Sequence, residues 1–529
     1  MIMKKNVLAL SVAAALGGGI IGVASASEAV LESGVGHKLF LPYFTTQNGN
    51  ATLINITNTD AVNGKAVKVR FRSGVDSDDI FDFQVFLSPS DVWTAAVTQA
   101  ADGTSQLSTS DKSCTLPTSV NQEFVTARLA PYTDAGSVTH GVAEQTREGY
   151  IEIFNMGDIP KLLPGTTNAN PLYTATKHVA GVPPCTAATL LGIEAAGGAV
   201  TAPAVTNTTH STTYGAATYT TTQELIAPSA TLMGDYVIIN VPKTLTYSGA
   251  MPAIKATTQT MIAYSGQTGT GRTAHHSVAA PGTLFPTLAL TEDGVLLNGA
   301  LNGVLTADYD FPDMSTPYEP AVAVLPREEA NNLSTALQHT GIMNEFMTDP
   351  AVSGATDWVI SLPTRRYHVA GRDVDYGTAG DGKGYPATAT IDGFVGGPTD
   401  LFAAGFTVYA ANGRSACVKT GSAPSYFDRE ETGAAGGGAV ISPGVPTTYS
   451  LCGEVNVLSW NNSGATSSTL GATLILANSS AAGVNLGWGI APLAILPVLG
   501  EAFEKANNPA ASAGVSGNYG ANFKHRYNP

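Results

Sequence analysis

Apolar and polar residues alternate with a period of two along much of this chain. In "KAVKVRFRSG", residues 65–74, Val67, Val69 and Phe71 fall on one face of an extended segment. The lysine and the two arginines between them fall on the other face. Alternation bounded by Asn, Gly, Asp or Pro is typical of antiparallel strands that bury one face and expose the other. The same pattern predicts strands at 50–58, 82–88, 149–155, 235–242, 357–369, 404–411, 454–461 and 471–478.

One segment, "LPREEANNLSTALQHTGIMNEFMTD" at 325–349, has helix signals instead. Pro326 suits a first helical position, and Glu328 and Glu329 interact favourably with the N-terminal end of the helix dipole. Apolar residues recur along the segment at helical spacing. We therefore predict two short helices, divided at Gly341.

Together these elements predict a mainly β fold. A chain of 529 residues exceeds one ordinary hydrophobic core, and the absence of a fixed repeat argues against a propeller or a solenoid. We predict two β-sandwich-like domains, at 27–320 and 321–529. The first has a loop insertion at about 162–232, and the second begins with the helical segment. A single sandwich that interleaves both halves is the alternative.

The first 26 residues, "MIMKKNVLALSVAAALGGGIIGVASA", have the pattern of a secretory signal. Lys4 and Lys5 precede an apolar run, and Ala24-Ser25-Ala26 is a small-residue cleavage site, so cleavage is expected before Ser27. No later stretch reaches the roughly 18 apolar residues of a membrane-spanning helix. We expect a secreted protein, extracellular or at the cell surface, with the periplasm as an alternative.

The charge content is low and acidic. Charged residues are 13% of the chain, and 26 Lys and Arg against 41 Asp and Glu give a net charge of −15. This balance excludes a general nucleic-acid binder, which needs clustered basic residues. It is compatible with divalent cations. Such sparse charge also favours a surface that is partly covered, through self-association or contact with other cell-surface components.

Four cysteines follow the signal, and in an oxidising compartment two disulfides are expected. Of the three possible connectivities we favour nearest neighbours, which keeps each bridge within one half of the chain. No two cysteines have the C-x-x-C spacing of a zinc site. The predicted pairs are Cys114–Cys185 and Cys417–Cys452.

An acidic turn separates two of the predicted strands, with Asp76, Asp78, Asp79 and Asp82 between Arg72 and Phe83. Carboxylates at this spacing can ligate Ca²⁺ through oxygen. The turn lacks the residue order of an EF-hand. We favour the simpler interpretation, in which these are solvated turn residues that pair weakly with the neighbouring lysine and arginines.

Two later segments, "TADYDFPD" and "GRDVDYGTAGDGKGY", repeat the acidic pattern. Turns exposed to solvent are again the simpler interpretation, and a calcium site or a sugar-contact loop is the alternative. A bound Ca²⁺ is the only cofactor that the sequence suggests. The candidate ligands in these two segments are Asp308, Asp310, Asp373 and Asp375, with Asp313 and Asp381 close by.

Catalytic motifs are absent from the sequence. It has no G-x-S-x-G and no H-E-x-x-H, and the adjacent His275 and His276 would point to opposite faces of a strand. The best pair of carboxylates is Asp428 with Glu430 or Glu431, but Arg429 between them favours a salt-bridged corner. A basic cluster that begins at Arg365 is expected to pair with acidic neighbours. We predict no catalytic residue.

Several segments together resemble a group of large exported, β-rich proteins of Gram-negative bacteria, described as hypothetical or cell-surface proteins. The resemblance covers most of the mature chain and implies export and a surface or extracellular role. It brings no catalytic residues. The segments that carry it are "LPYFTTQNGNATLINITNT", "KAVKVRFR", "DFQVFLSPSDVWTA", "TREGYIEIFNMGD", "MNEFMTDP", "TDWVISLPTRRYHV", "FDREE" and "LCGEVNVLSW".

From these observations we predict a structural protein of the cell surface, such as a surface-layer, matrix or filament subunit, assisted by calcium. A glycan- or polymer-binding adhesin that acts through its long loops is the alternative. An enzyme that degrades an extracellular polymer is a third hypothesis.

Overall fold

A computed structural model describes most of the chain. The described residues are 28–75, 77, 79–126, 129, 131–133, 138–190, 213–214, 217–218, 224–256, 312–314, 326–365, 407–409, 416–419, 424–429, 433–435, 450–461, 468–474, 476–480, 484–512 and 515–528. The predicted signal, residues 1–26, lies outside them. Strands dominate the described residues, so the prediction of a mainly β fold is confirmed.

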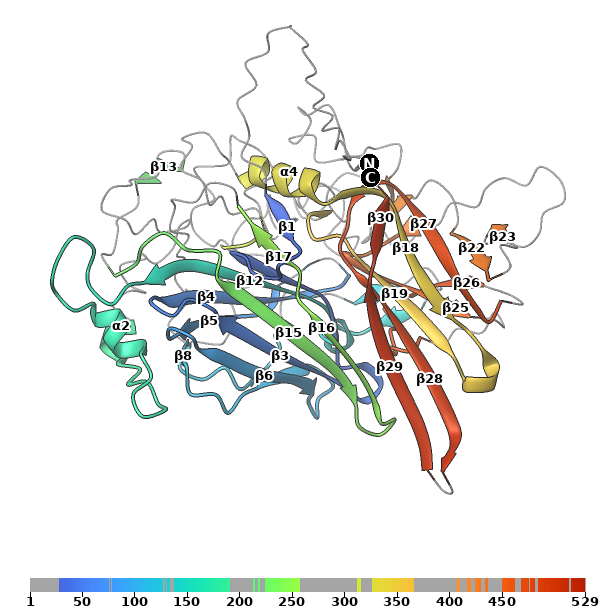
Figure 1. Ribbon diagram of the computed structural model, residues 1–529, viewed down its shortest axis with the longest axis horizontal. Helices are drawn as coiled ribbons and strands as arrows, with labels where there is room; N and C mark the ends of the chain where they lie inside the picture. The colour runs from blue at the N-terminus through green and yellow to red at the C-terminus, as the bar shows by residue number, and fades with distance from the viewer. Residues whose placement is uncertain are drawn as a thin grey trace, which may run out of the picture.

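The N-terminal half contains a sheet of seven strands and a sheet of six strands (Figure 1). The seven-stranded sheet has the order β1 (Ala29–Leu31), β17 (Ala253–Lys255), β2 (Lys38–Thr45), β12 (Glu148–Ile159), β4 (Gly64–Ser73), β5 (Asp79–Leu87) and β8 (Cys114–Leu116). The six-stranded sheet has the order β16 (Leu245–Ala250), β15 (Leu232–Asn240), β3 (Asn50–Asn58), β6 (Val92–Gln99), β7 (Ser105–Ser108) and β9 (Gln122–Glu123).

The described part of the C-terminal half contains two sheets of five strands and one sheet of three strands. One has the order β23 (Gly433–Ala435), β22 (Ser425–Asp428), β27 (Leu486–Pro497), β18 (Gln338–Met347) and β30 (Arg526–Asn528). The other has the order β26 (Leu476–Ser480), β25 (Val455–Asn461), β19 (Ala355–Ser361), β28 (Glu501–Ser512) and β29 (Val515–Lys524).

Smaller elements complete the described structure. The predicted insertion at 162–232 contains helix α2 and the hairpin β13–β14. Bounds of the small elements are α1 (Val142–Gln145), α2 (Pro171–Thr176), α4 (Pro326–Ala336), η1 (Gln47–Gly49), η4 (Pro350–Val352), β10 (Tyr132–Thr133), β11 (Thr139–His140), β13 (Thr213–Tyr214), β14 (Ala217–Thr218), β20 (Thr407–Tyr409), β21 (Ala416–Lys419) and β24 (Ser450–Leu451).

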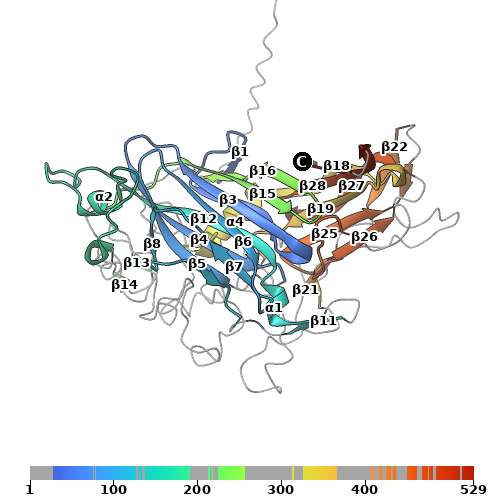
Figure 2. The same cartoon turned by 90° about the horizontal axis from the view of Figure 1, so that it is seen from below.

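Apolar side chains that face inward from the paired sheets form the core of each half. In the N-terminal half Phe83 packs against Trp93 across the two sheets, with ring centroids 5.3 Å apart. In the C-terminal half Phe346 stacks on Trp460 at 4.7 Å. The larger of these cores also contains Val359 of the C-terminal half. The two halves therefore share a continuous apolar interior, and Figures 1 and 2 show their sheets side by side, with β16 next to β29.

The prediction of two short helices at 325–349 is wrong in its second part. Helix α4 ends at Ala336, and β18 follows directly. In β18, Ile342, Asn344 and Phe346 are buried, whereas the residues between them are more exposed. Of the two apolar residues that we assigned to a helix face here, Phe346 is thus an inward position of a strand, whereas Met343 is only partly buried. Pairing with β27 on one side and β30 on the other decides between the two structures.

Every residue of β2, β4, β5 and β12 is buried. The alternation predicted one solvated face for this sheet, and that prediction is wrong. Lys68, Arg70 and Arg72 lie on the predicted polar face, yet each is 0% exposed. The seven-stranded sheet therefore has an apolar face toward the six-stranded sheet and a buried, charged face on its other side.

Candidate functional site

The acidic turn contributes to this charged face. Nη1 of Arg70 lies 2.5 Å from Oδ2 of Asp79 and 3.2 Å from Oδ2 of Asp82. Nζ of Lys68 lies 3.1 Å from the other oxygen of Asp82. Pairing of Asp79 and Asp82 with the neighbouring cations is confirmed, but these pairs are buried rather than solvated. The end of the hairpin packs against the C-terminal half, where the backbone amide of Val455 donates to the carbonyl oxygen of Gly74 at 3.1 Å.

A second ion pair continues the charged face onto β12. Nε of Arg72 lies 3.0 Å from Oε2 of Glu152, and Nη1 of Arg72 donates to the carbonyl oxygen of Ser77 at 2.9 Å. The hydroxyls of Tyr150 and Ser77 are 2.7 Å apart. The guanidinium thus fixes both the neighbouring strand and the turn. We call Lys68, Arg70, Arg72, Asp79, Asp82 and Glu152 the ion-pair layer.

The calcium hypothesis stays a prediction. Asp79 and Asp82 lie against cationic side chains, which removes the need for a metal at those two residues. Within the described ranges, no group of three or more His, Cys, Asp or Glu side chains is arranged to hold a metal ion. The remaining candidate ligands lie outside the described residues: Asp76, Asp78, Asp308, Asp310, Asp373 and Asp375.

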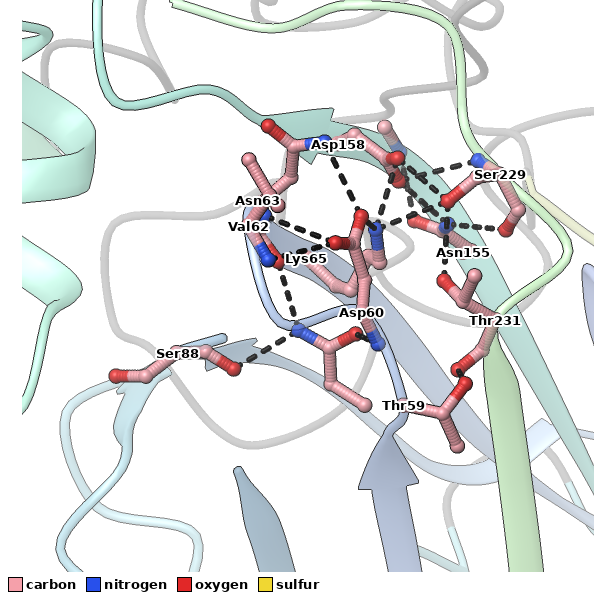
Figure 3. Close-up of polar contacts among 12 residues, drawn as sticks. Thr59, Asp60, Val62, Asn63, Lys65, Ser88, Asn155, Asp158, Ser229 and Thr231 are labelled. Atoms are coloured by element: carbon pink, nitrogen blue, oxygen red, sulfur yellow. Dashed lines mark hydrogen bonds and ion pairs between the residues drawn. The ribbon is translucent and has the colours of Figure 1, made fainter. Parts of the chain in front are cut away.

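Another buried cation, Lys65, lies at the end of the same sheet (Figure 3). Nζ of Lys65 is 2.8 Å from a carboxylate oxygen of both Asp60 and Asp158, and 3.0 Å from Oγ of Ser229. Burial raises the pKa of Asp60, but bonds from Lys65 and from two backbone amides outweigh it and bring the pKa to about 2. A serine beside a lysine suggests a nucleophile. However, Nζ of Lys65 also contacts two carboxylates, so the geometry is that of an ion pair that joins the strand ends.

A serine, a histidine and an aspartate also meet between β5 and α2, which the sequence did not reveal. Nδ1 of His178 lies 2.8 Å from Oγ of Ser88 and 3.3 Å from Oδ2 of Asp91. A catalytic triad needs the serine and the acid on different ring nitrogens. Here both contact the same nitrogen, and Ser88 is buried at 3% exposure. The cluster therefore joins a strand end to a helix end and has no relay geometry.

The other residues that the sequence pattern pointed to form an ion pair, lie at a strand end or in a turn, or are outside the described ranges. Nη1 of Arg365 is 2.5 Å from Oε2 of Glu454, which confirms its predicted pairing with an acid. Asp428 ends β22, and Arg429 is exposed in the turn after it. His275, His276, Asp381, Glu430 and Glu431 are not among the described residues.

The predicted disulfide Cys114–Cys185 is confirmed, with the two Cα atoms 5.3 Å apart. It joins β8 to the segment after α2. Cys452 is disulfide-bonded as well. Strand β21 pairs with β24 so that Val418 is opposite Leu451, and this antiparallel register brings the backbone of Cys417 opposite Cys452. The register favours the predicted Cys417–Cys452 pairing.

An open groove of about 690 Å³ crosses the outer face of the six-stranded sheet, over β15, β3 and β6. Its lining combines short polar side chains with a few aliphatic ones and one carboxylate. Leu53, Asn55, Thr94, Thr109 and Asp235 are the lining residues that could contact a bound ligand.

Comparison with protein-family models, with curated proteins and with solved structures finds no match for this chain. The resemblance to exported bacterial surface proteins therefore stays a prediction. In the described part of the chain, no helix has the length and apolar character needed to cross a membrane.

Proposed function

We propose that this protein is a non-enzymatic structural component of the bacterial cell surface, the subunit of a layer, a matrix or a fibre. The ion-pair layer is the observation that carries the proposal. Two of the carboxylates that the sequence offered for chemistry, Asp79 and Asp82, neutralise cations inside the protein together with Glu152, at 0–2% side-chain exposure. Acids held in this way are not available to a substrate.

A building role also fits the energetics of such a layer. Buried ion pairs add little net stability, but a wrong strand register would leave charges buried without partners, at a cost of several kcal/mol. The layer thus favours one arrangement of β4, β5 and β12. The shared core and the disulfide add rigidity, which is useful in a repeating subunit.

Electron microscopy of the cells that make the protein tests the proposal. We expect an ordered layer or fibres on the cell surface that are lost when the gene is deleted and return on complementation. Purified protein is examined with and without Ca²⁺, because calcium assistance predicts assembly only with the ion. An unchanged surface in the deletion strain, together with monodisperse protein under both conditions, would overturn the proposal.

Binding of a glycan or another hydroxyl-rich polymer is the second candidate function, and the open groove favours it. Short hydroxyl, amide and carboxylate groups such as Thr94, Asn55 and Asp235 are the usual partners of sugar hydroxyls, and Leu53 offers apolar surface to the sugar ring.

Glycan-array binding by two matched variants tests this candidate. Thr94→Arg fills the groove, whereas Thr246→Arg makes the same change at an exposed position of the same sheet outside the groove. We expect only Thr94→Arg to abolish binding to a retained glycan. No binding by the wild-type protein, or equal loss in both variants, would exclude the groove.

A further inference from the structure

The segment "STLGATL", residues 468–474, lies between the two halves of the molecule, and we call it the junction loop. Its Leu470 is buried in the shared core. Asn50 donates to the carbonyl oxygen of Leu470 at 2.6 Å, and Asn48 donates to that of Gly471 at 2.8 Å. The junction loop belongs to the C-terminal half and is bound by side chains of the N-terminal half.

Two buried carboxylates hold the ends of the junction loop. Oε1 of Glu148 accepts from the backbone amide of Thr473 at 2.8 Å and from its hydroxyl at 3.0 Å. Oδ2 of Asp357 accepts from the hydroxyl of Ser468 at 2.6 Å and from the backbone amide of Leu470 at 2.8 Å. Glu148 starts β12 in the N-terminal half and Asp357 lies on β19 in the C-terminal half, so each half contributes one acid.

Glu148 has no cationic partner among the described residues. Its titratable and charged neighbours are Tyr43 on β2, Glu144 on α1 and Arg147 beside it. The guanidinium of Arg147 is directed elsewhere, with Nε 2.5 Å from the carbonyl oxygen of Gly103. Burial raises the pKa of Glu148 to about 7, although hydrogen bonds from Thr473 lower it.

Asp357 likewise has no cationic partner in the described part of the C-terminal half. Tyr43 and Tyr247 interact electrostatically with it, Glu504 lies near Tyr247, and none of the three is a cation. The hydroxyl of Tyr247 bonds to Thr469 of the junction loop at 2.7 Å. Burial raises the pKa of Asp357 to about 6, against hydrogen bonds from Leu470 and Ser468 that lower it.

We infer that Glu148 and Asp357 form a protonation-controlled clamp, which holds the junction loop between the two halves when protonated and releases it at alkaline pH. A neutral carboxyl still offers an oxygen to the donors of the loop but carries no charge that burial penalises. The clamp does not depend on the proposed function, because it concerns how the halves are joined.

The direction of the pH dependence follows from the raised pKa of both acids. Each binds its proton more tightly in the closed state than in water, so the clamp contributes fully below about pH 4. That contribution is lost as the pH rises through 6 and 7. Each tenfold difference in proton affinity between the closed and open states changes the opening equilibrium tenfold. Ionisation of Glu148 alone therefore favours release by roughly a hundredfold.

Hydrogen–deuterium exchange of the full chain between pH 5 and pH 9, corrected for the intrinsic pH dependence of exchange, tests the clamp. In the wild-type protein we expect the protection of residues 468–474 to fall by at least a hundredfold across this range, because the ionisation of Asp357 adds to that of Glu148. In the double variant Glu148→Gln, Asp357→Asn, which keeps an acceptor and a neutral group at both positions, protection should not change with pH.

Asp60→Asn is the matched control, because it removes a carboxylate that contacts a cation far from the junction. Its junction loop should follow the wild-type pH profile. If the double variant does not fold, Glu148→Gln alone should lose most of the pH dependence. Constant protection in the wild type, or an unchanged pH profile in the Gln and Asn variants, would overturn the inference.

Discussion

Arg72 and Glu152 form an ion pair across β4 and β12 in which Nε and Oε2 are 3.0 Å apart and neither side chain has exposed surface. The strand register sets Arg72 opposite Tyr150 and Arg70 opposite Glu152, so the pair runs diagonally between two strands. Each charge offsets the free-energy cost of burying the other. Removal of one therefore costs more than the contact itself contributes.

Glu152→Gln should lower the free energy of unfolding by about 3–5 kcal/mol, because it leaves the buried guanidinium of Arg72 with less compensating charge. Chemical denaturation followed by circular dichroism measures the change. Glu123→Gln, at an exposed position on β9, is the matched control and should change stability by less than about 0.5 kcal/mol. Equal effects of the two variants would contradict a structural role for the ion-pair layer.

The alternation in "KAVKVRFRSG" predicted the strand and the division of its residues between two faces. It could not predict that the polar face is buried, because an alternating strand has the same pattern whether water or protein lies on its second face. The partners of that face are distant in sequence, as Arg72 and Glu152 are. A strand pattern contains no information about such partners.

Loss of the disulfide Cys114–Cys185 should destabilise the N-terminal half. The bridge spans 71 positions in the sequence, and a loop of that size corresponds to about 4 kcal/mol of unfolded-state entropy. The double variant Cys114→Ser, Cys185→Ser should lose about that much in denaturant unfolding, and a reducing agent should then have no further effect on this half. Unchanged stability would mean that the bridge only joins parts that are already rigid.

The error at β18 has a different cause. Helix spacing and strand alternation both place apolar residues at 342 and 346, so a short segment fits either pattern. Neighbours in the sheet decide between them, and β27 lies more than a hundred residues away in the sequence. The Ser88–His178–Asp91 cluster escaped prediction for the same reason, because its members come together only through the fold.

We predict that the buried ring of His525 makes the fold less stable at acidic pH. Its Nδ1 accepts from Asn344 at 3.0 Å and its Nε2 donates to the carbonyl oxygen of Val359 at 2.9 Å, so the neutral ring has both nitrogens bonded. Burial lowers the pKa of His525 to about 4, against the bond to Val359, which raises it. The neutral ring therefore stabilises the fold fully above about pH 6.5, and this contribution declines as the pH falls through 4.

Nuclear magnetic resonance of the imidazole protons measures this directly. The His525 signal, assigned by its loss in His525→Gln, should titrate with a midpoint near 4, and unfolded protein should show the ordinary value near 6.5. A midpoint near 6.5 in the folded protein would mean that the ring is accessible to water. The bonds to Asn344 and Val359 would then not exist in solution.

Gly471 in the junction loop can be compared with Gly165, which has the same backbone conformation but no close neighbouring atoms. Gly471 and Gly165 both have φ of +72°, a region that costs other residues about 1–2 kcal/mol. A Cβ at Gly471 would lie 2.6 Å from Nδ2 of Asn48, whereas at Gly165 nothing lies within 4 Å.

Gly165→Ala should therefore cost about 1–2 kcal/mol in denaturant unfolding. Gly471→Ala should cost about 2 kcal/mol more, because it also displaces the Asn48 side chain that holds the junction loop. If both substitutions cost the same, Asn48 moves away freely and the junction loop is held mainly by its carboxylates.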